Sequence, residues 1–85
     1  VSDQLERPVM TLVPNPTDGL VTITTEKPMA AIRIHDALGR AVYSGSATAN
    51  RRAVDLGELP PGTYHVQVEY ADGMRESKRL LVVRR

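Results

Sequence analysis

The sequence predicts an all-β domain built as an antiparallel β-sandwich, and three observations support this. Apolar and polar residues alternate in short runs spaced roughly ten residues apart, turn residues separate the runs, and no segment has a convincing helical period. The apolar residues are mostly β-branched, with ten Val and three Ile but no Phe or Trp, which favours strands over helices. A chain of 85 residues is long enough for one small domain and not for two.

The alternation places seven strands along the chain. Residues 1–8 are polar, end in Pro and are interpreted as a linker, so the folded domain is expected to occupy residues 9–85. In each predicted strand the apolar residues fall largely on one face, as expected when that face is buried. The predicted strands are Val9–Val13, Leu20–Thr25, Ala31–His35, Arg40–Ser44, Ala53–Leu56, Tyr64–Tyr70 and Met74–Val83.

Turn residues separate the strands. The two prolines of Pro14–Pro16 remove backbone donors and lock φ, and Asp18-Gly19 favours a turn directly after them. Asp36–Gly39 predicts a four-residue reversal, and Leu59–Gly62 predicts a turn before the clearest strand. Asp72-Gly73 predicts a two-residue type I′ hairpin that joins the last two strands.

The last strand departs from the alternation, because residues 80–83 are continuously apolar. One interpretation is a central strand covered on both faces, or a bulge that shifts the register. The other is that one apolar face, flanked by arginines, stays free for a partner, with the strand binding by edge addition. The residues alone leave both open.

Charge is distributed unevenly, although the whole chain carries only +1. Residues 75–85 carry five basic groups and one acidic group, while the preceding residues carry six basic and nine acidic groups. The low net charge and the three scattered tyrosines argue against a nucleic-acid partner. No apolar run is long enough to span a membrane, and the first residues do not resemble a signal peptide. If the domain is exported, that signal is expected on a longer parent chain.

Catalytic chemistry finds little support in the residues. The chain has no Cys, and Ser44-Gly45-Ser46 lacks the strand-to-helix elbow of a hydrolase nucleophile. His35 and His65 are predicted on the polar faces of different strands, where they are interpreted as solvated side chains and not as metal ligands. We therefore expect no enzyme activity, no small-molecule substrate, no cofactor and no metal site. A weak calcium site among the turn aspartates is a remaining alternative.

Three blocks together resemble the type A C-terminal sorting domain of the bacterial type IX (Por) secretion system. Residues 12–23, LVPNPTDGLVTI, are similar to the family opening "YPNPxxG…xI", with Val13 where an aromatic residue is frequent. Residues 32–43, IRIHDALGRAVY, resemble the second family block. Residues 54–68, VDLGELPPGTYHVQV, followed by residues 78–84, resemble the third. The blocks fall in family order over nearly the whole chain.

The resemblance implies a non-catalytic secretion signal. Such domains direct an upstream cargo domain from the periplasm through the outer-membrane shuttle and translocon to the cell surface or the medium. A sortase-like transpeptidase commonly removes the domain and attaches the cargo to the surface. In the family the last strand matters most for export, and the residues that correspond here are Lys78, Arg79, Leu80, Leu81, Val82, Val83, Arg84 and Arg85.

The other motif residues are interpreted as determinants of the fold first and of docking second. They are Pro14, Asn15, Pro16, Gly19, Asp36, Gly39, Arg40, Leu59, Gly62 and Tyr64. Tyr64 follows a Leu-Pro-Pro-Gly turn at the start of a strand, as in a tyrosine corner, which favours a seven-stranded Ig-like sandwich.

The alternative function is an Ig- or fibronectin-like structural or binding module of a secreted hydrolase or adhesin. A calcium- or sugar-binding accessory domain is a third, weaker hypothesis. Whatever the function, an exposed strand in a free domain can pair with that of a second copy to form a dimer.

Overall fold

The computed structural model describes residues 10–46 and 48–83, and within these it contains seven strands and no helix. The seven predicted strands are all present, with shifts of a few residues at their ends. The strands are β1 (Thr11–Val13), β2 (Leu20–Thr24), β3 (Met29–His35), β4 (Ala41–Ser46), β5 (Arg51–Asp55), β6 (Gly62–Tyr70) and β7 (Arg75–Val82). No helix in the described part of the chain is long and apolar enough to cross a membrane.

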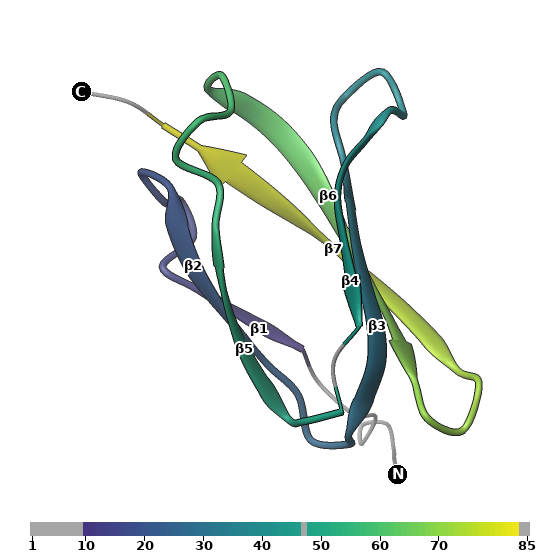
Figure 1. Cartoon of the computed structure of the whole chain (residues 1–85). Helices are drawn as coiled ribbons and strands as arrows, with labels where there is room; N and C mark the ends of the chain where they lie inside the picture. Colours follow the sequence, from purple (N-terminus) through teal and green to yellow (C-terminus); the bar gives the residue numbers. More distant parts are fainter. Residues whose placement is uncertain (1–9, 47, 84–85) are drawn as a thin grey trace, which may run out of the picture.

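The strands form two antiparallel sheets that face each other (Figure 1). One sheet has the order β1-β2-β5 and the other the order β4-β3-β6-β7. The chain crosses repeatedly between the sheets, so each layer contains strands that are distant in the sequence. This arrangement confirms the predicted antiparallel sandwich.

The core fills the space between the two sheets. Its members are β-branched or other aliphatic residues, two methionines and two tyrosines, because the inward positions of the strands are apolar. β4 contributes only partly buried side chains, those of Val42 and Tyr43. Tyr64 and Tyr70, predicted on one face of the same strand, are 4% and 3% exposed. The buried core residues are Met10, Leu12, Val21, Ile23, Met29, Ile32, Ile34, Val54, Leu56, Tyr64, Val66, Val68, Tyr70, Leu80 and Val82.

The hairpin between β6 and β7 has a three-residue loop, whereas the sequence predicted a two-residue type I′ turn. Tyr70 and Met74 close the loop through a 2.7 Å bond from the Tyr70 N–H to the Met74 carbonyl. The Gly73 N–H donates to the Tyr70 carbonyl at 2.9 Å, and Gly73 has a φ of 93°. The loop is a tight turn followed by Gly73 in a left-handed conformation. Such a loop favours Gly after Asp just as the predicted type I′ turn does, so both fit the same Asp-Gly sequence.

Tyr64 forms the tyrosine corner that the sequence predicted. Its hydroxyl donates to the Pro60 carbonyl at 2.5 Å, four residues upstream, while its ring lies in the core. The side chain therefore fixes the turn before β6 against the start of that strand.

Candidate functional site in the C-terminal strand

The candidate site is β7, which lies at the edge of the four-stranded sheet next to β6. Leu80 and Val82 are buried in the core at 0% and 1% exposure, whereas Leu81 and Val83 are 40% and 37% exposed on the other face. The β6–β7 register is continuous. The expectation of a central strand or a bulge is therefore wrong: the apolar run supplies the core with one face and leaves two apolar side chains exposed on the other.

The segment before β2 occupies the free edge of β7 at its C-terminal end. The Asn15 side chain donates through Nδ2 to the Arg79 carbonyl at 3.0 Å and accepts through Oδ1 from the Leu81 N–H at 3.1 Å. The Thr17 N–H donates to the Leu81 carbonyl at 2.9 Å, and the Val83 N–H donates to the Thr17 carbonyl at 2.8 Å. Between Arg79 and Val83 the edge is already paired, so the expected edge addition is not available there.

The Asn15 side chain hydrogen-bonds to the backbone of β7 as the backbone of a neighbouring strand would. Its amide group carries one acceptor and two donors, so it can satisfy an N–H and a C=O of β7 at the same time. The motif Pro14–Pro16 holds Asn15 between two prolines, and the bonds Val13–Pro14 and Asn15–Pro16 are both cis. The first family block and the last strand, far apart in the sequence, thus form one structural unit.

Thr17 is the residue of this unit that the sequence reading missed. It is only 1% exposed, and its hydroxyl donates to the Leu20 carbonyl at 2.6 Å and accepts from the Gly19 N–H at 3.1 Å. Its backbone is bridged to Val82 in parallel orientation. A Thr placed between Pro and Asp-Gly is the available signal, because a hydroxyl at such a position commonly closes a local turn.

The basic residues near the end of β7 lie on opposite faces of the strand. Lys78 lies on the inward side and donates from Nζ to the Met10 carbonyl at 3.1 Å, which ties β7 to the start of the described chain. Arg79 is exposed on the outer face, and no ion pair within the described residues involves it. Arg84 and Arg85 lie outside the described residues.

Arg79 continues a row of polar side chains across the outer face of the sheet. His35 and His65 are direct cross-strand partners on β3 and β6, and His65 is in turn opposite Arg79 on β7. The sequence placed both histidines correctly on polar faces but did not bring them together, because strand pairing is not contained in the alternation. No group of three or more His, Cys, Asp or Glu side chains within residues 10–46 and 48–83 could hold a metal ion.

The remaining motif residues shape turns at other places in the sandwich. Asp36 accepts from the Leu38 and Arg40 N–H groups through Oδ1, at 3.0 and 2.9 Å, and from Arg40 Nε through Oδ2 at 2.9 Å. These hydrogen bonds, led by that of the Arg40 N–H, hold the pKa of Asp36 below its ordinary value. Gly39 completes the turn with a φ of 85°, which residues with a Cβ rarely adopt.

Gly19, Gly62 and Leu59 complete the set of motif residues. The Gly19 carbonyl accepts from the Leu56 N–H at 2.8 Å, and Gly62 begins β6 with a φ of 155°. Leu59 packs partly buried against the core. The bonds of Asp36 and Tyr64 are local, whereas the Gly19–Leu56 bond joins segments that are far apart in the sequence.

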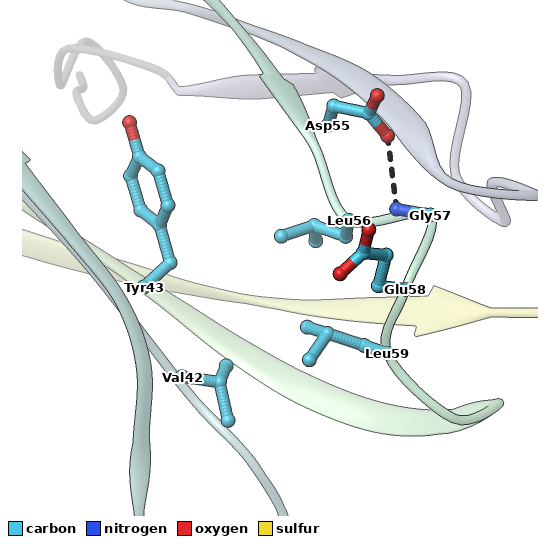
Figure 2. A pocket seen from close by; sticks show the side chains of 7 residues that line it. All are labelled: Val42, Tyr43, Asp55, Leu56, Gly57, Glu58 and Leu59. Carbon is cyan, nitrogen blue, oxygen red and sulfur yellow. Dashed lines mark hydrogen bonds between the residues drawn. The ribbon is translucent and has the colours of Figure 1, made fainter.

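A pocket of about 310 Å³ opens between β4 and the segment after β5 (Figure 2). Its carboxylates come from Asp55 and Glu58, and Asp55 Oδ1 accepts from the Gly57 N–H at 2.9 Å. Its other lining residues are Val42, Tyr43, Leu56 and Leu59. The pocket is lined mainly by apolar side chains that also border the core. β4, which contributes Val42 and Tyr43 to it, is at the opposite edge of the four-stranded sheet from β7.

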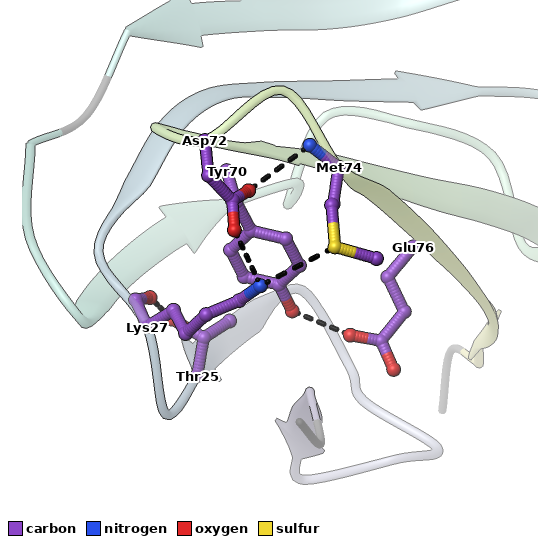
Figure 3. Close-up of polar contacts among 6 residues, drawn as sticks. All are labelled: Thr25, Lys27, Tyr70, Asp72, Met74 and Glu76. Atoms are coloured by element: carbon purple, nitrogen blue, oxygen red, sulfur yellow. Dashed lines mark hydrogen bonds and ion pairs between the residues drawn. The ribbon is translucent and has the colours of Figure 1, made fainter. Parts of the chain in front are cut away.

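A polar cluster surrounds Tyr70 at the opposite end of β7 (Figure 3). The Tyr70 hydroxyl donates to Glu76 Oε1, and Lys27 pairs with Asp72 at 2.9 Å while its Nζ lies 4.9 Å from the centre of the Tyr70 ring. Burial of the phenol, followed by the Glu76 carboxylate, raises the pKa of Tyr70 far above its ordinary value. The cluster joins the β6–β7 hairpin to the loop before β3.

A family model described as a secretion system C-terminal sorting domain, that of the Por secretion system, matches residues 11–83. The chain belongs to this family. The match includes all seven strands and all three sequence blocks up to Val83, so the resemblance noted from the motifs is confirmed. The family is that of type IX secretion sorting domains and implies the role of a secretion signal.

Solved structures show the same sandwich in other proteins. PorZ, described as an essential surface component of the type IX secretion system of Porphyromonas gingivalis, is 24% identical with a TM-score of 0.73. That match covers 88% of this sorting domain, which spans only 11% of the PorZ chain.

Two smaller proteins align along most of their length. A DUF3244 family protein from Bacteroides vulgatus, with an immunoglobulin-like β-sandwich, is 16% identical with a TM-score of 0.68, over 91% of this chain and 95% of that one. CopC from Methylosinus trichosporium is 19% identical with a TM-score of 0.56, over 89% and 91%. These likenesses establish the Ig-like fold of the sorting domain. No curated protein matches the chain.

Proposed function

We propose that this sorting domain is a non-catalytic address that directs an upstream cargo protein from the periplasm through the outer-membrane type IX translocon. The observation that carries the proposal is the family match over residues 11–83. In this proposal the cargo reaches the cell surface or the medium, and a sortase-like transpeptidase removes the domain and attaches the cargo. The secretion machinery is the partner, and no cofactor takes part.

We further propose that the machinery reads the exposed side of the end of β7. Arg79, Leu81 and Val83 present a guanidinium and two apolar side chains on one face, and Arg84 and Arg85 follow them. Asn15 and Thr17 hold the backbone of this segment by four hydrogen bonds, which supports recognition of a rigid shape. Leu80 and Val82 act indirectly, because their side chains belong to the core.

A secretion assay tests the proposal. Residues 1–85 are fused to the C-terminus of a periplasm-targeted fluorescent protein and expressed in a type IX-competent bacterium and in a translocon-deficient strain. Surface or medium fluorescence in the competent strain alone is the expected result. Equal retention in both strains, with the domain shown to be folded, would contradict the address function and favour an Ig-like spacer.

The recognition surface needs variants that keep the fold. Leu81→Ala, and separately the pair Arg84→Ala and Arg85→Ala, remove exposed or terminal groups and are expected to reduce export while the melting temperature stays nearly unchanged. Leu38→Ala is the matched control, since Leu38 is 80% exposed on the turn between β3 and β4, and β4 is at the opposite edge of the sheet from β7. Normal export of both β7 variants would place the recognition surface elsewhere. Deletion of residues 78–85 is expected to block export and also to unfold the domain, because β7 pairs with β6 along its length.

A further inference from the structure

The free edge of β7 consists of a closed part and an open part. The four bonds from Asn15 and Thr17 reach the backbone groups of Arg79, Leu81 and Val83. Backbone groups in a strand point to opposite sides in alternate residues, so the odd-numbered residues of β7 face the free edge and the even-numbered ones face β6. The bond from the Tyr70 N–H to the Met74 carbonyl agrees with this alternation. Arg75 and Ser77 therefore also direct their N–H and C=O groups to the free edge.

The open part extends from Arg75 to the N–H of Arg79. Within the described residues no hydrogen bond involves the N–H or C=O of Arg75, the N–H or C=O of Ser77, or the N–H of Arg79. These groups alternate as donor and acceptor along about five residues, which is the length of an ordinary strand. An unpaired edge of this kind is a template for another extended chain.

The outward-facing side chains of the open edge are basic or neutral donors, while Glu76 lies on the inward side and accepts from the Tyr70 hydroxyl. Arg75, Ser77 and Arg79 lie exposed on the outer face, and neither arginine forms an ion pair within the described residues. A hollow of about 440 Å³ lies on this face and is lined by Thr63, His65, Ser77, Lys78 and Arg79. A strand added at the free edge would lie on the side of β7 away from β6. Its carboxylates would be beside the Arg75 and Arg79 guanidinium groups, and opposite charges in cross-strand positions are stabilising.

Charge disfavours a second copy of the chain at this edge in the register centred on Ser77. Antiparallel pairing of β7 with another β7 centred on Ser77 would place Arg75 of one copy opposite Arg79 of the other, and like charges in such positions are destabilising. Charge thus favours an acidic segment over self-association, and a basic edge is a recognised protection against pairing between identical chains.

We propose that residues 75–79 form a docking edge that binds an extended acidic segment of a partner protein by strand addition. The partner strand pairs with the backbone of Arg75, Ser77 and Arg79 and places its carboxylates beside the two arginines. The Asn15 side chain ends the docking edge, because it already occupies the Arg79 carbonyl and the Leu81 N–H. The inference goes beyond the proposed function: the docking edge shares Arg79 with the recognition surface proposed there, but peptide binding to the purified chain is measured without export.

Binding of a synthetic peptide to the purified chain of residues 1–85 tests the inference. The probe is a fluorescein-labelled seven-residue peptide that alternates Glu and Val, and a peptide that alternates Lys and Val is the charge control. Ser77→Pro removes the outward N–H without breaking a bond to β6, and proline is tolerated at a strand edge. Ser77→Ala keeps the N–H and is the matched control. Circular dichroism and thermal melting show that each variant is folded.

The expected result is that the acidic peptide binds the native chain and Ser77→Ala equally, and binds Ser77→Pro at least tenfold more weakly. A tenfold loss corresponds to about 1.4 kcal/mol. The amides of Ser77 and Arg79 should gain protection from hydrogen exchange when the peptide binds. Equal binding by a folded Ser77→Pro variant, equal binding of the basic peptide, or protection only at other strands would overturn the inference. A dimer of the chain at micromolar concentration, broken by Ser77→Pro, would assign the edge to a second copy instead.

Discussion

Replacement of Asn15 by Ala tests the structural unit formed by the first family block and the last strand. The change removes two hydrogen bonds, from Nδ2 to the Arg79 carbonyl and from the Leu81 N–H to Oδ1. A hydrogen bond contributes a net stability of about 0.5–1.5 kcal/mol. Because these bonds are exposed and water can replace Asn15, we expect the free energy of unfolding to fall by about 1–2 kcal/mol in total. In a domain whose whole stability is about 4–13 kcal/mol, that loss is readily measured.

Urea denaturation and thermal melting measure the change. A loss of 1 kcal/mol lowers the melting temperature of a domain of this size by about 4–8 °C. Hydrogen exchange locates the effect. The Leu81 amide should lose more protection than the fall in global stability explains, whereas the Val66 amide in the neighbouring strand β6 should lose no more than that fall. Asn15→Asp keeps the acceptor for the Leu81 N–H but loses the donor to the Arg79 carbonyl, so it should lie between Ala and the native chain.

One result would refute this reasoning. If Asn15→Ala changes the free energy of unfolding by less than about 0.5 kcal/mol, the range of an ordinary surface substitution, and leaves Leu81 protected, the side chain does not hold the edge of β7. The family motif would then need a different explanation.

Three further predictions concern the fold and its acid stability. Tyr64→Phe removes the bond to the Pro60 carbonyl and should cost about 1 kcal/mol in urea denaturation, without a change of fold in circular dichroism; an unchanged midpoint would contradict the tyrosine corner. Leu80→Ala should cost about 2–5 kcal/mol, while Leu81→Ala should stay within about 0.5 kcal/mol, so equal losses would be inconsistent with the alternation of β7. The pKa of Asp36 is lowered in the folded state, so its contribution to stability is present above the unfolded carboxyl pKa and is lost as the pH falls through the lowered value. Asp36→Asn should therefore reduce the fall in melting temperature under acid conditions, and an unchanged acid dependence would count against the turn contacts.

The alternation and the turn residues were sufficient to predict the sandwich, because strand period and turn chemistry are local properties. The same signals predicted that the last strand pairs with β6, since a short Asp-Gly connection can only join neighbouring antiparallel strands. They did not predict the loop type at that hairpin, because Asp-Gly is compatible both with a two-residue turn and with the three-residue loop that forms. The choice between them depends on the register of the flanking strands.

The candidate site was predicted only in part, because the contacts that build it join distant segments of the chain. Composition located the basic and apolar end of the chain, and the motifs located Asn15, yet nothing local indicates that the Asn15 side chain lies against the backbone of Arg79 and Leu81. The pairing of His35 with His65 was likewise invisible, since cross-strand neighbours are set by sheet order and register. The local alternation of apolar and polar residues was enough to predict which face of each strand is buried. Tertiary structure alone decided which strand lies at an edge and what covers it, because those contacts join residues that are more than sixty positions apart.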